Sequence, residues 1–433
     1  MNKKSVIKNF LVSIFFILLT QNCYSVSQKT NTCPITPKIK RSLNTKLRLT
    51  LPGAIRLGIK QRPSLKALQF ATTSQQKEAD KQLSSYLPQL TVSGPTLYTF
   101  PTRKLDSISI SISQLLYSPA GPGDLYRISM KSVKISQYAQ ALHEDLIQHQ
   151  VEHAFLKCWL LEEKRYFITT LKVASDELYS KATHKDLAGL LNKQEKLRAD
   201  TSNIAADAKV ITYFNQLFPA RGRLEYFIGE KLFCRELSKM PLHWRLKENP
   251  IKLDTLDNYC QKSYENRKEI KSKNVEIRQA ELYKKYYAKK HYPSFNAGSS
   301  LDNNDQSLYF KMTWNIFDGL SSRFSYDSFK AKKMKIQMEK SDLIQKINLE
   351  VETEFYHLKI LLKDLEAKAV ALKAAKNLLV LSKEKFKVGL NTKVAVKIAN
   401  ENWEKSHFEW LEYCIACQLK KSDLDFACGY PKN

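Results

Sequence analysis

Thiols and imidazoles are the side chains of this sequence with the most obvious capacity for chemistry. Cys414 and Cys417 form a C-x-x-C pair, which could be redox-active or supply half of a metal site. No second C-x-x-C or histidine pair at ligand spacing lies near them in the sequence, so we interpret them as two packed thiols. His143, His149 and His153 lie in a charged helical segment without a glycine-flanked nucleophile or a paired carboxylate motif. We expect surface or helix-packing histidines, and the sequence predicts no catalytic residue, no metal ligand and no cofactor.

The first 25 residues have the pattern of a secretory signal peptide. Lysines precede an apolar run from Phe10 to Leu19, and Ser25 stands at a suitable cleavage position. The run is about half of the roughly 20 residues that a membrane-spanning helix needs. An alternative uses Cys23 as a lipidated N-terminus. Export would leave an odd number of cysteines, seven of the eight, where disulfides persist, so at least one stays free or pairs between chains.

The composition favours long helices and a strongly basic surface. Only 12 glycines and 14 prolines occur in 433 residues, which is few for a loop-rich protein. The formal net charge of +27 would suit a nucleic acid, an anionic membrane surface or a lysine-lined pore. Because the sequence has no zinc-finger spacing and no aromatic RNA-binding strand, we expect no nucleic-acid partner. Lysine-rich, solvated helix faces explain much of the charge.

The chain repeats its own plan. Three segments recur in the same order, the first two at an offset of 205 residues and the third at 200: Arg62–Lys66 with Arg267–Lys271, Tyr86–Leu90 with His291–Phe295, and Ile112–Tyr117 with Met312–Phe317. Each half reads as a helix, two strands, a very long helix, a tight reversal and a returning helix. We therefore divide the mature chain into a basic extension (26–48), a first repeat (49–218) with a hairpin at 88–117, a belt (219–250), a second repeat (251–429) with a hairpin at 294–317, and a tail (430–433).

The predicted hairpins have one apolar and one polar face. Residues 107–112 and 308–316 alternate strictly between apolar and polar types. Strands of roughly 10 residues can cross a bilayer at a tilt. Four strands cannot close, and open edges in a membrane leave backbone groups unsatisfied, so this interpretation requires an oligomer. The residues expected to face lipid are Ile108, Ile110, Ile112, Leu308, Phe310, Met312, Trp314 and Ile316.

The helices after the hairpins are much longer than an ordinary domain needs. Leu125 to about Lys181 and Leu320 to Val388 contain neither proline nor glycine, and at 1.5 Å per residue each would reach roughly 85 to 100 Å. The segments Asp186–Phe218 and Asn391–Ala427 have compatible apolar spacing. We expect them to fold back as antiparallel coiled-coil partners.

The chain resembles the TolC-like outer-membrane factors, the outer membrane efflux proteins, from about Leu49 to Gly429. The resemblance is carried, in order, by LTLPGAI at 49–55, RPSL at 62–65, LPQL at 87–90, WNIFDG at 314–319 and KVGLNT at 387–392. It implies a homotrimer in which one twelve-stranded β-barrel continues into one α-helical coiled-coil barrel. It also implies docking to a periplasmic adaptor (membrane fusion) protein and to an inner-membrane pump or ABC transporter.

These expectations together describe a passive exit duct in outer-membrane lipid, with its helical barrel in the periplasm, and not an enzyme. Such a subunit would serve a tripartite efflux or type I secretion system. Drugs, metal ions and polypeptides use the same kind of duct, so the cargo does not follow from the sequence. The alternative is an exported, basic coiled-coil envelope scaffold without a pore, in which the alternating segments are soluble hairpins.

Gly389 lies where the second long helix must reverse, which suits a left-handed C-cap, and Asn391 or Thr392 can cap the next helix. The resemblance implies that the Val388-Gly389-Leu390 tip contacts the adaptor. The corresponding position in the first half, at an offset of 207, is Ala182, a weaker match.

The entrance to the duct departs from the family. In the family, acidic residues six and nine positions beyond the tip glycine ring the closed aperture and favour cations. Here those positions are Ala395 and Ile398, with Lys393 and Lys397 beside them. We expect a constriction closed by packing, with a weak preference for anions. In the alternative, these residues face a neighbouring helix and the gate lies elsewhere.

Overall fold

The computed structural model describes residues 49–94, 109–188, 192–232, 237, 251, 253–301 and 306–430. All of these belong to one compact unit, Leu47–Asn433. The expected signal peptide (1–25) and the whole of the expected extension (26–48) lie outside the described residues. Most of the predicted belt after Leu232 lies outside the described residues as well.

Each repeat begins with two helices separated by a break at an arginine. In the first repeat α2 (Leu51–Gln61) and α3 (Pro63–Ser84) are separated by Arg62, which has φ −65° and ψ 117°. In the second, α7 (Leu256–Asn266) and α8 (Lys268–Lys289) are separated by Arg267, with φ −57° and ψ 121°. The two breaks have almost the same backbone conformation at the offset of 205 residues that the sequence comparison gives.

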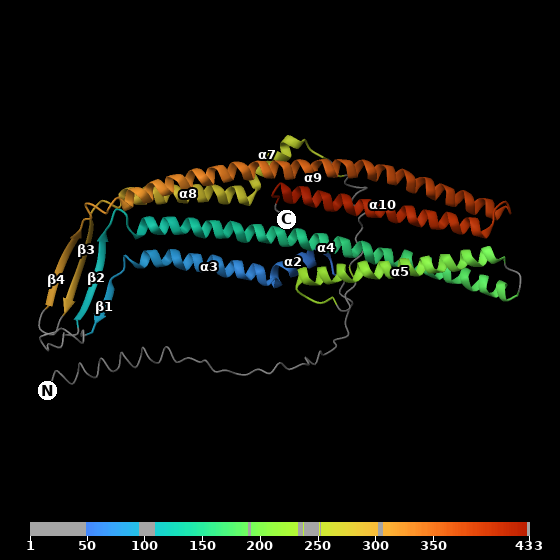
Figure 1. The fold of residues 1–433 in the computed structure, drawn as a ribbon, viewed down its shortest axis with the longest axis horizontal. Coiled ribbons are helices and arrows are strands. Elements are labelled where there is room, and N and C mark those ends of the chain that lie inside the picture. The colour runs from blue at the N-terminus through green and yellow to red at the C-terminus, as the bar shows by residue number, and fades with distance from the viewer. Residues whose placement is uncertain are drawn as a thin grey trace, which may run out of the picture. The chain divides into compact units, whose positions relative to one another are not determined.

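Two very long helices follow, each paired with a returning helix (Figure 1). In the first repeat α4 (Pro122–Leu187) packs on α3 and on α5 (Lys193–Ile228). In the second, α9 (Ser321–Lys387) packs on α8 and on α10 (Lys393–Ala427). Contacts of α4 with α8 and with α10 join the two repeats.

The hydrophobic core is itself duplicated. One cluster contains buried residues of α4 and the other contains buried residues of α9 that are identical at an offset of 200: Ile147, Val151 and Phe155, matched by Ile347, Val351 and Phe355. Leu224 near the end of α5 and Leu424 near the end of α10 are fully buried in the same two clusters. Burial of matching apolar side chains gives both halves the same helix packing.

The four strands form one antiparallel sheet in the order β1-β2-β3-β4. β1 (Gln89–Ser93) pairs with β2 (Ser109–Tyr117), and β3 (Ser294–Leu301) pairs with β4 (Gln306–Thr313). The β2–β3 pairing joins the hairpin of one repeat to that of the other. Figure 1 shows the sheet at the end of the helices where α3, α4, α8 and α9 meet it.

The helix boundaries around the first reversal differ from those predicted, and α5 begins at Lys193 and not at Asp186. α4 continues to Leu187, so Ala182 lies within this helix and not at the reversal. α5 continues through Pro219 to Ile228. Proline removes one backbone donor, but Leu224 and Ile228 are buried in the core and keep the segment helical beyond it.

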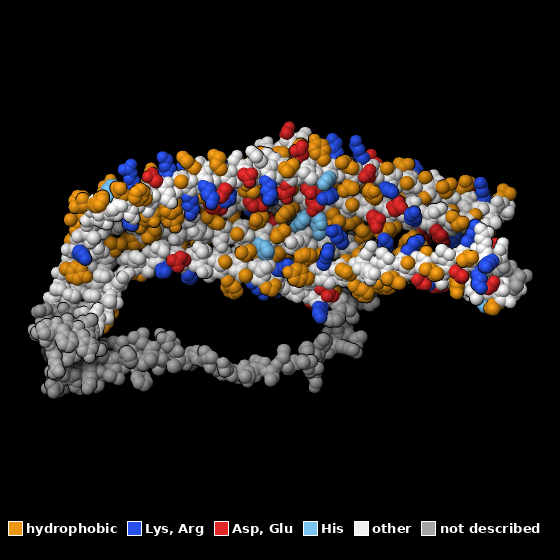
Figure 2. Space-filling view, in the orientation of Figure 1, with side chains coloured by type: hydrophobic (Ala, Val, Ile, Leu, Met, Phe, Trp, Pro, Cys, Tyr) orange, Lys and Arg blue, Asp and Glu red, His pale blue; other side chains and the backbone are white. Residues whose placement is uncertain are grey.

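Basic and acidic side chains are interspersed along the helices on the face shown in Figure 2. Many form ion pairs between helices, such as Lys368 with Glu409 and Lys420 with Glu354, each at 2.9 Å. This distribution suits solvated helix faces. Within the described part, none of the helices is both long and apolar enough to span a bilayer.

Candidate functional site

The sheet separates apolar from polar residues onto opposite faces. Opposed residues of antiparallel strands share a face, and one row of the register runs Leu90, Ile112, Ser299, Leu308 across all four strands. We define the apolar sheet face by its hydrophobic members: Leu90, Val92, Ile110, Ile112, Phe295, Ala297, Leu301, Leu308, Phe310 and Met312. The opposite face is mostly polar, with residues such as Thr91, Ser111, Ser300, Ser307, Asn296 and Lys311.

Most side chains of the apolar sheet face are exposed in the described part of the chain. Leu308 is 88% exposed, Phe310 67% and Leu90 66%. An apolar surface of this extent normally marks a contact with another protein or with lipid. Five residues predicted to face lipid lie on it: Ile110, Ile112, Leu308, Phe310 and Met312.

The other three residues predicted to face lipid do not lie in the described strands. Ile108 lies outside the described residues. Trp314 and Ile316 lie beyond β4, which ends at Thr313. The next position opposite Trp314 would be Pro293, which has no N–H to donate to a ladder, and the Trp314 indole Nε1 instead donates to the His291 carbonyl at 2.9 Å. Both side chains are nevertheless exposed.

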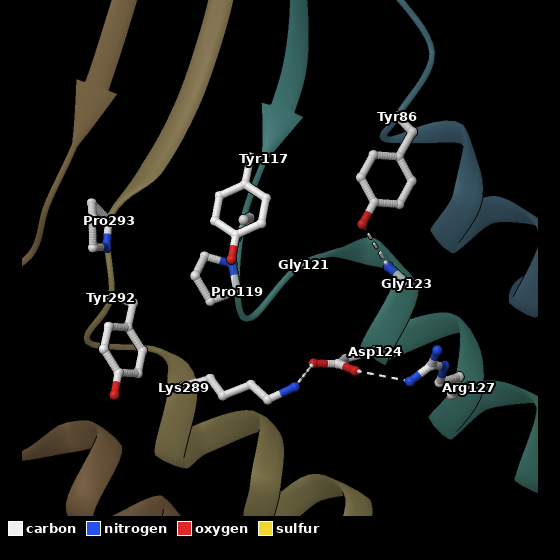
Figure 3. Close-up of a pocket in the computed structure, with 11 residues that line it drawn as sticks. Tyr86, Tyr117, Pro119, Gly121, Gly123, Asp124, Arg127, Lys289, Tyr292 and Pro293 are labelled. Carbon is white, nitrogen blue, oxygen red and sulfur yellow. Dashed lines mark hydrogen bonds and ion pairs between the residues drawn. The ribbon is translucent and has the colours of Figure 1, made fainter.

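Tyrosines and charged residues surround a hollow where the sheet meets the helices (Figure 3). The hollow has a volume of about 630 Å³. The Tyr86 hydroxyl accepts a hydrogen bond from the Gly123 backbone at 3.2 Å, and Lys289 pairs with Asp124 at 2.9 Å. A Cβ atom at Gly121 would lie 2.6 Å from the Ser118 carbonyl oxygen, so this tight turn requires glycine. Aromatic and basic residues of this kind are typical of the border between lipid and water.

The helix that follows the second hairpin, α9, is capped by Asp318 of the WNIFDG motif. The Asp318 carboxylate accepts hydrogen bonds from the hydroxyl and from the backbone N–H of Ser322, the latter at 2.9 Å. These bonds hold the pKa of Asp318 below its ordinary value, because they favour the ionised form. The motif therefore fixes the start of α9 beside β4.

The far end of α9 is a helix cap built on Gly389. The residue has φ +76°, as the sequence predicts, and the Leu390 N–H donates to the Lys385 carbonyl at 2.8 Å while the Gly389 N–H donates to Phe386 at 3.1 Å. These two bonds define a Schellman motif. Thr392 caps the next helix by accepting from the Ala395 N–H at 3.2 Å. Val388 and Leu390 are 70% and 78% exposed, so the tip presents two apolar side chains to solvent.

The first repeat reverses between Ala188 and Asn192. Ala188 is the C-cap of α4 with φ −83° and ψ 3°, close to the −91° and 10° of Val388. Asn192 caps α5 by accepting from the Gln194 N–H. The predicted offset of 207 between the halves gives Ala182 and therefore does not identify this tip. The offset of 200 aligns Ala188-Gly189-Leu190 with Val388-Gly389-Leu390, and residues 189–191 lie outside the described part.

The four candidate aperture residues lie in the first turns of α10. Ile398 is 53% exposed and Ala395 is half-buried. The Lys397 ammonium donates to the Ala174 carbonyl of α4 at 3.2 Å, so it bridges two helices of the chain. Lys393 is the first residue of α10, and its side chain is not among those described.

The C-x-x-C pair lies in the core of α10. Both thiols are fully buried, and burial raises the pKa of Cys414 to about 12 and that of Cys417 to about 11. A redox-active cysteine needs the opposite, an accessible thiol with a lowered pKa. All five cysteines within the described part are unpaired. The interpretation of packed thiols is confirmed.

The structure is similar to solved outer-membrane proteins over most of its length. It matches the MtrE outer-membrane channel of Neisseria gonorrhoeae with a TM-score of 0.69 at 14% identity, covering 88% of each chain. It matches the CmeC outer-membrane channel of Campylobacter jejuni at 0.67 and 12% identity, covering 88% of this chain and 85% of CmeC. The outer-membrane protein VceC of Vibrio cholerae gives 0.65 at 10% identity, with 88% and 96% coverage.

The chain has the fold of these outer-membrane channels. The resemblance stated from the sequence motifs is thereby confirmed at the level of fold, although no family model matches the sequence and a search of curated proteins finds no match. Contact of the tip with an adaptor, contact of the apolar sheet face with lipid, and the position of the aperture remain predictions.

Proposed function

We propose that the protein is an outer-membrane channel subunit that acts as the passive exit duct of a tripartite efflux or type I secretion system. The observation that carries the proposal is the exposed apolar sheet face at the end of long paired helices (Figure 1). The fold shared with outer-membrane channels supports the same conclusion. In this function the apolar face contacts lipid and the polar face lines a water-filled lumen.

The duct is an oligomer, because one chain cannot close its sheet. β1 and β4 are the two outer strands, and their outer edges would leave N–H and C=O groups unsatisfied in hydrocarbon. A neighbouring chain can pair its β4 with β1 and so satisfy both edges. Three copies would supply twelve strands, the number that the resemblance to TolC-like factors implies.

The helices then extend into the periplasm and end at the tip. Val388 and Leu390 offer apolar contacts on a rigid cap, which suits docking to a periplasmic adaptor protein. The adaptor would in turn connect the duct to an inner-membrane pump or ABC transporter. The cargo passes through the lumen without chemical change.

A coiled-coil scaffold without a pore is the weaker candidate. Paired helices and a basic surface suit it equally well. It leaves the apolar sheet face in water, however, where residues such as Leu308 and Phe310 would be 88% and 67% exposed without any contact.

Purification and bilayer recording test the proposal. We expect the full chain to leave the membrane fraction only with detergent, to migrate as a heat-modifiable trimer, and to give stepwise ion conductance in a planar bilayer. A monodisperse monomer in detergent-free buffer would contradict the channel function and favour the scaffold.

A further inference from the structure

Two histidines of the first repeat and one aspartate of the second converge between α4 and α10. The Nε2 atoms of His149 and His153 each lie 2.8 Å from the Asp423 carboxylate oxygen Oδ1. The three potential ligand atoms all lie within 4.8 Å of one another. Their side chains are 17 to 21% exposed, so the cluster is largely enclosed.

The orientation of these groups is fixed by their neighbours. The two histidines are four residues apart and therefore lie on the same face of α4. The His149 ring stacks on Phe426, with 4.7 Å between centroids, and lies at a tilt against the His153 ring, with 4.3 Å between centroids. Lys420 holds the other Asp423 oxygen, Oδ2, at 3.0 Å, which leaves Oδ1 directed at the imidazoles. The ligands are thus arranged before any ion arrives.

Hydrogen bonding alone does not satisfy the cluster. The contact between His149 and Asp423 has hydrogen-bond geometry. The His153 Nε2 atom is equally close to the same oxygen, yet it is buried and has no hydrogen-bond partner with acceptable geometry among the described residues. A buried, unsatisfied ring nitrogen is costly. A cation between the three groups would accept a lone pair from each nitrogen and from the carboxylate.

The local charge also favours a cation. The Asp423 carboxylate contacts both imidazoles through Oδ1 and the Lys420 ammonium through Oδ2. The positive charge of Lys420 opposes binding of a cation, but Lys420 also forms an ion pair with Glu354 at 2.9 Å, which offsets that charge. Asp423 and Glu354 thus supply two carboxylates against the single ammonium of Lys420, and this excess of acidic groups favours a cation.

We propose that His149, His153 and Asp423 bind one divalent transition-metal ion, of the Zn²⁺ or Co²⁺ class, between the two repeats. Two imidazoles and one carboxylate form a donor set that suits these ions, with water in a fourth position. Ligand atoms bound at about 2.0–2.1 Å in a tetrahedral site lie roughly 3.4 Å apart, so each imidazole nitrogen needs to move only about half an ångström away from Asp423 Oδ1. The ion would fasten α4 to α10 and so hold the two coiled coils together.

Metal titration of the detergent-solubilised full chain, stripped with a chelator, tests the site. We expect Co²⁺ to bind at one ion per chain with a visible absorption spectrum of nitrogen and oxygen ligation, and Zn²⁺ to displace it. Zn²⁺ should also raise the temperature of unfolding. Loss of a supporting group around a metal costs about 10- to 100-fold in affinity, so we expect His149→Gln, His153→Gln and Asp423→Asn each to lower it by more than about 100-fold.

Two matched variants serve as controls. His143 lies on the same helix but contacts Ser64 at 2.8 Å, and Asp425 pairs with Lys421 at 2.6 Å. His143→Gln and Asp425→Asn should bind Co²⁺ as the wild type does. Failure of the wild-type chain to bind one ion, or wild-type affinity in folded His149→Gln, would overturn the site. Because binding is measured without conductance, this result is independent of the proposed channel function.

Discussion

Two arginines at equivalent places hold the helix breaks of the repeats by different means. Arg62 precedes Pro63, which disfavours a helical conformation for the residue before it. Arg267 precedes a lysine, so no proline ring restricts its backbone. Its side chain is buried and donates to the Ala427 carbonyl at 2.7 Å and to the Glu269 carboxylate at 2.9 Å, and these bonds stabilise the break. The same backbone bend therefore depends on a ring in one repeat and on buried hydrogen bonds in the other.

We therefore expect Arg267→Ala to destabilise the protein much more than Arg62→Ala. Arg267 also forms an ion pair with Glu350. Removing one partner of a buried ion pair costs about 3–5 kcal/mol, and the partial exposure of Glu350 places Arg267 near the lower end. The guanidinium of Arg62 donates to the exposed carbonyl of Tyr226, so its loss should cost about 1 kcal/mol. Thermal unfolding in detergent, followed by circular dichroism, measures both. Equal shifts would show that the buried contacts of Arg267 do not hold the break.

The conformation of Gly389 gives a second residue-scale prediction. A β-branched side chain at φ +76° costs about 1–2 kcal/mol and distorts the cap. Gly389→Val should leave membrane insertion and trimer formation unchanged and reduce export, because the tip is remote from the sheet. Gly389→Asn, which tolerates the left-handed region, should retain most export activity. Wild-type export by the valine variant would remove the case for a functional tip.

At the scale of elements, successive residues of each strand lie alternately on the apolar sheet face and on the mostly polar opposite face. In β4 the apolar sheet face has Leu308, Phe310 and Met312, and the opposite face has Ser307 and Lys311. Lysine is thus already present on one face of this strand. Gly298 of β3 leaves room for the Tyr309 ring, whose hydroxyl would lie 2.4 Å from an added Cβ.

A lysine substitution should therefore affect oligomer formation differently on the two faces of β4. Phe310→Lys puts a charge on the apolar sheet face, which costs about 2–4 kcal/mol if that face is near the middle of a bilayer. Ser307→Lys puts the same charge on the polar face. We expect a marked fall in heat-modifiable oligomer for the first variant and little change for the second. Similar yields would mean that the apolar face does not contact lipid.

Local patterns predicted most of these elements, and the errors have local causes. The absence of proline and glycine predicted α9 within one residue at each end. The end of α4 was misplaced because Gly389 was matched to Ala182 at an offset of 207, whereas the offset of 200 matches it to Gly189. Trp314 continues the alternation of β4, but Pro293 opposite it ends the ladder. The cluster around Asp423 was not predicted, because 274 residues separate it from His149 and only the packing of α4 on α10 brings them together.

At the scale of the whole molecule, duplication gives each chain two equivalent hairpins and two equivalent coiled coils. The halves are joined by β2–β3 pairing and by contacts of α4 with α8 and α10. Both reversals lie at the helix ends away from the sheet (Figure 1). In a closed oligomer the first turns of α10 would therefore recur around one axis near the entrance.

Charge at this entrance should decide the ion selectivity of the duct. Ala395 and Ile398 stand at the two positions for which the resemblance to TolC-like factors implies acidic residues, and Lys397 is next to Ile398 in the sequence. If these positions line the aperture, we expect weak anion preference in a planar bilayer. Ala395→Asp would introduce one carboxylate per chain at the narrowest point. It should increase the cation-to-anion permeability ratio several-fold and confer block by divalent cations. The reason is that one carboxylate from each chain would face the same narrow pore, where their negative potentials add and attract cations. Ala395→Ser, which changes size similarly without adding charge, should leave the ratio unchanged. A conducting Ala395→Asp channel with wild-type selectivity would place the aperture elsewhere.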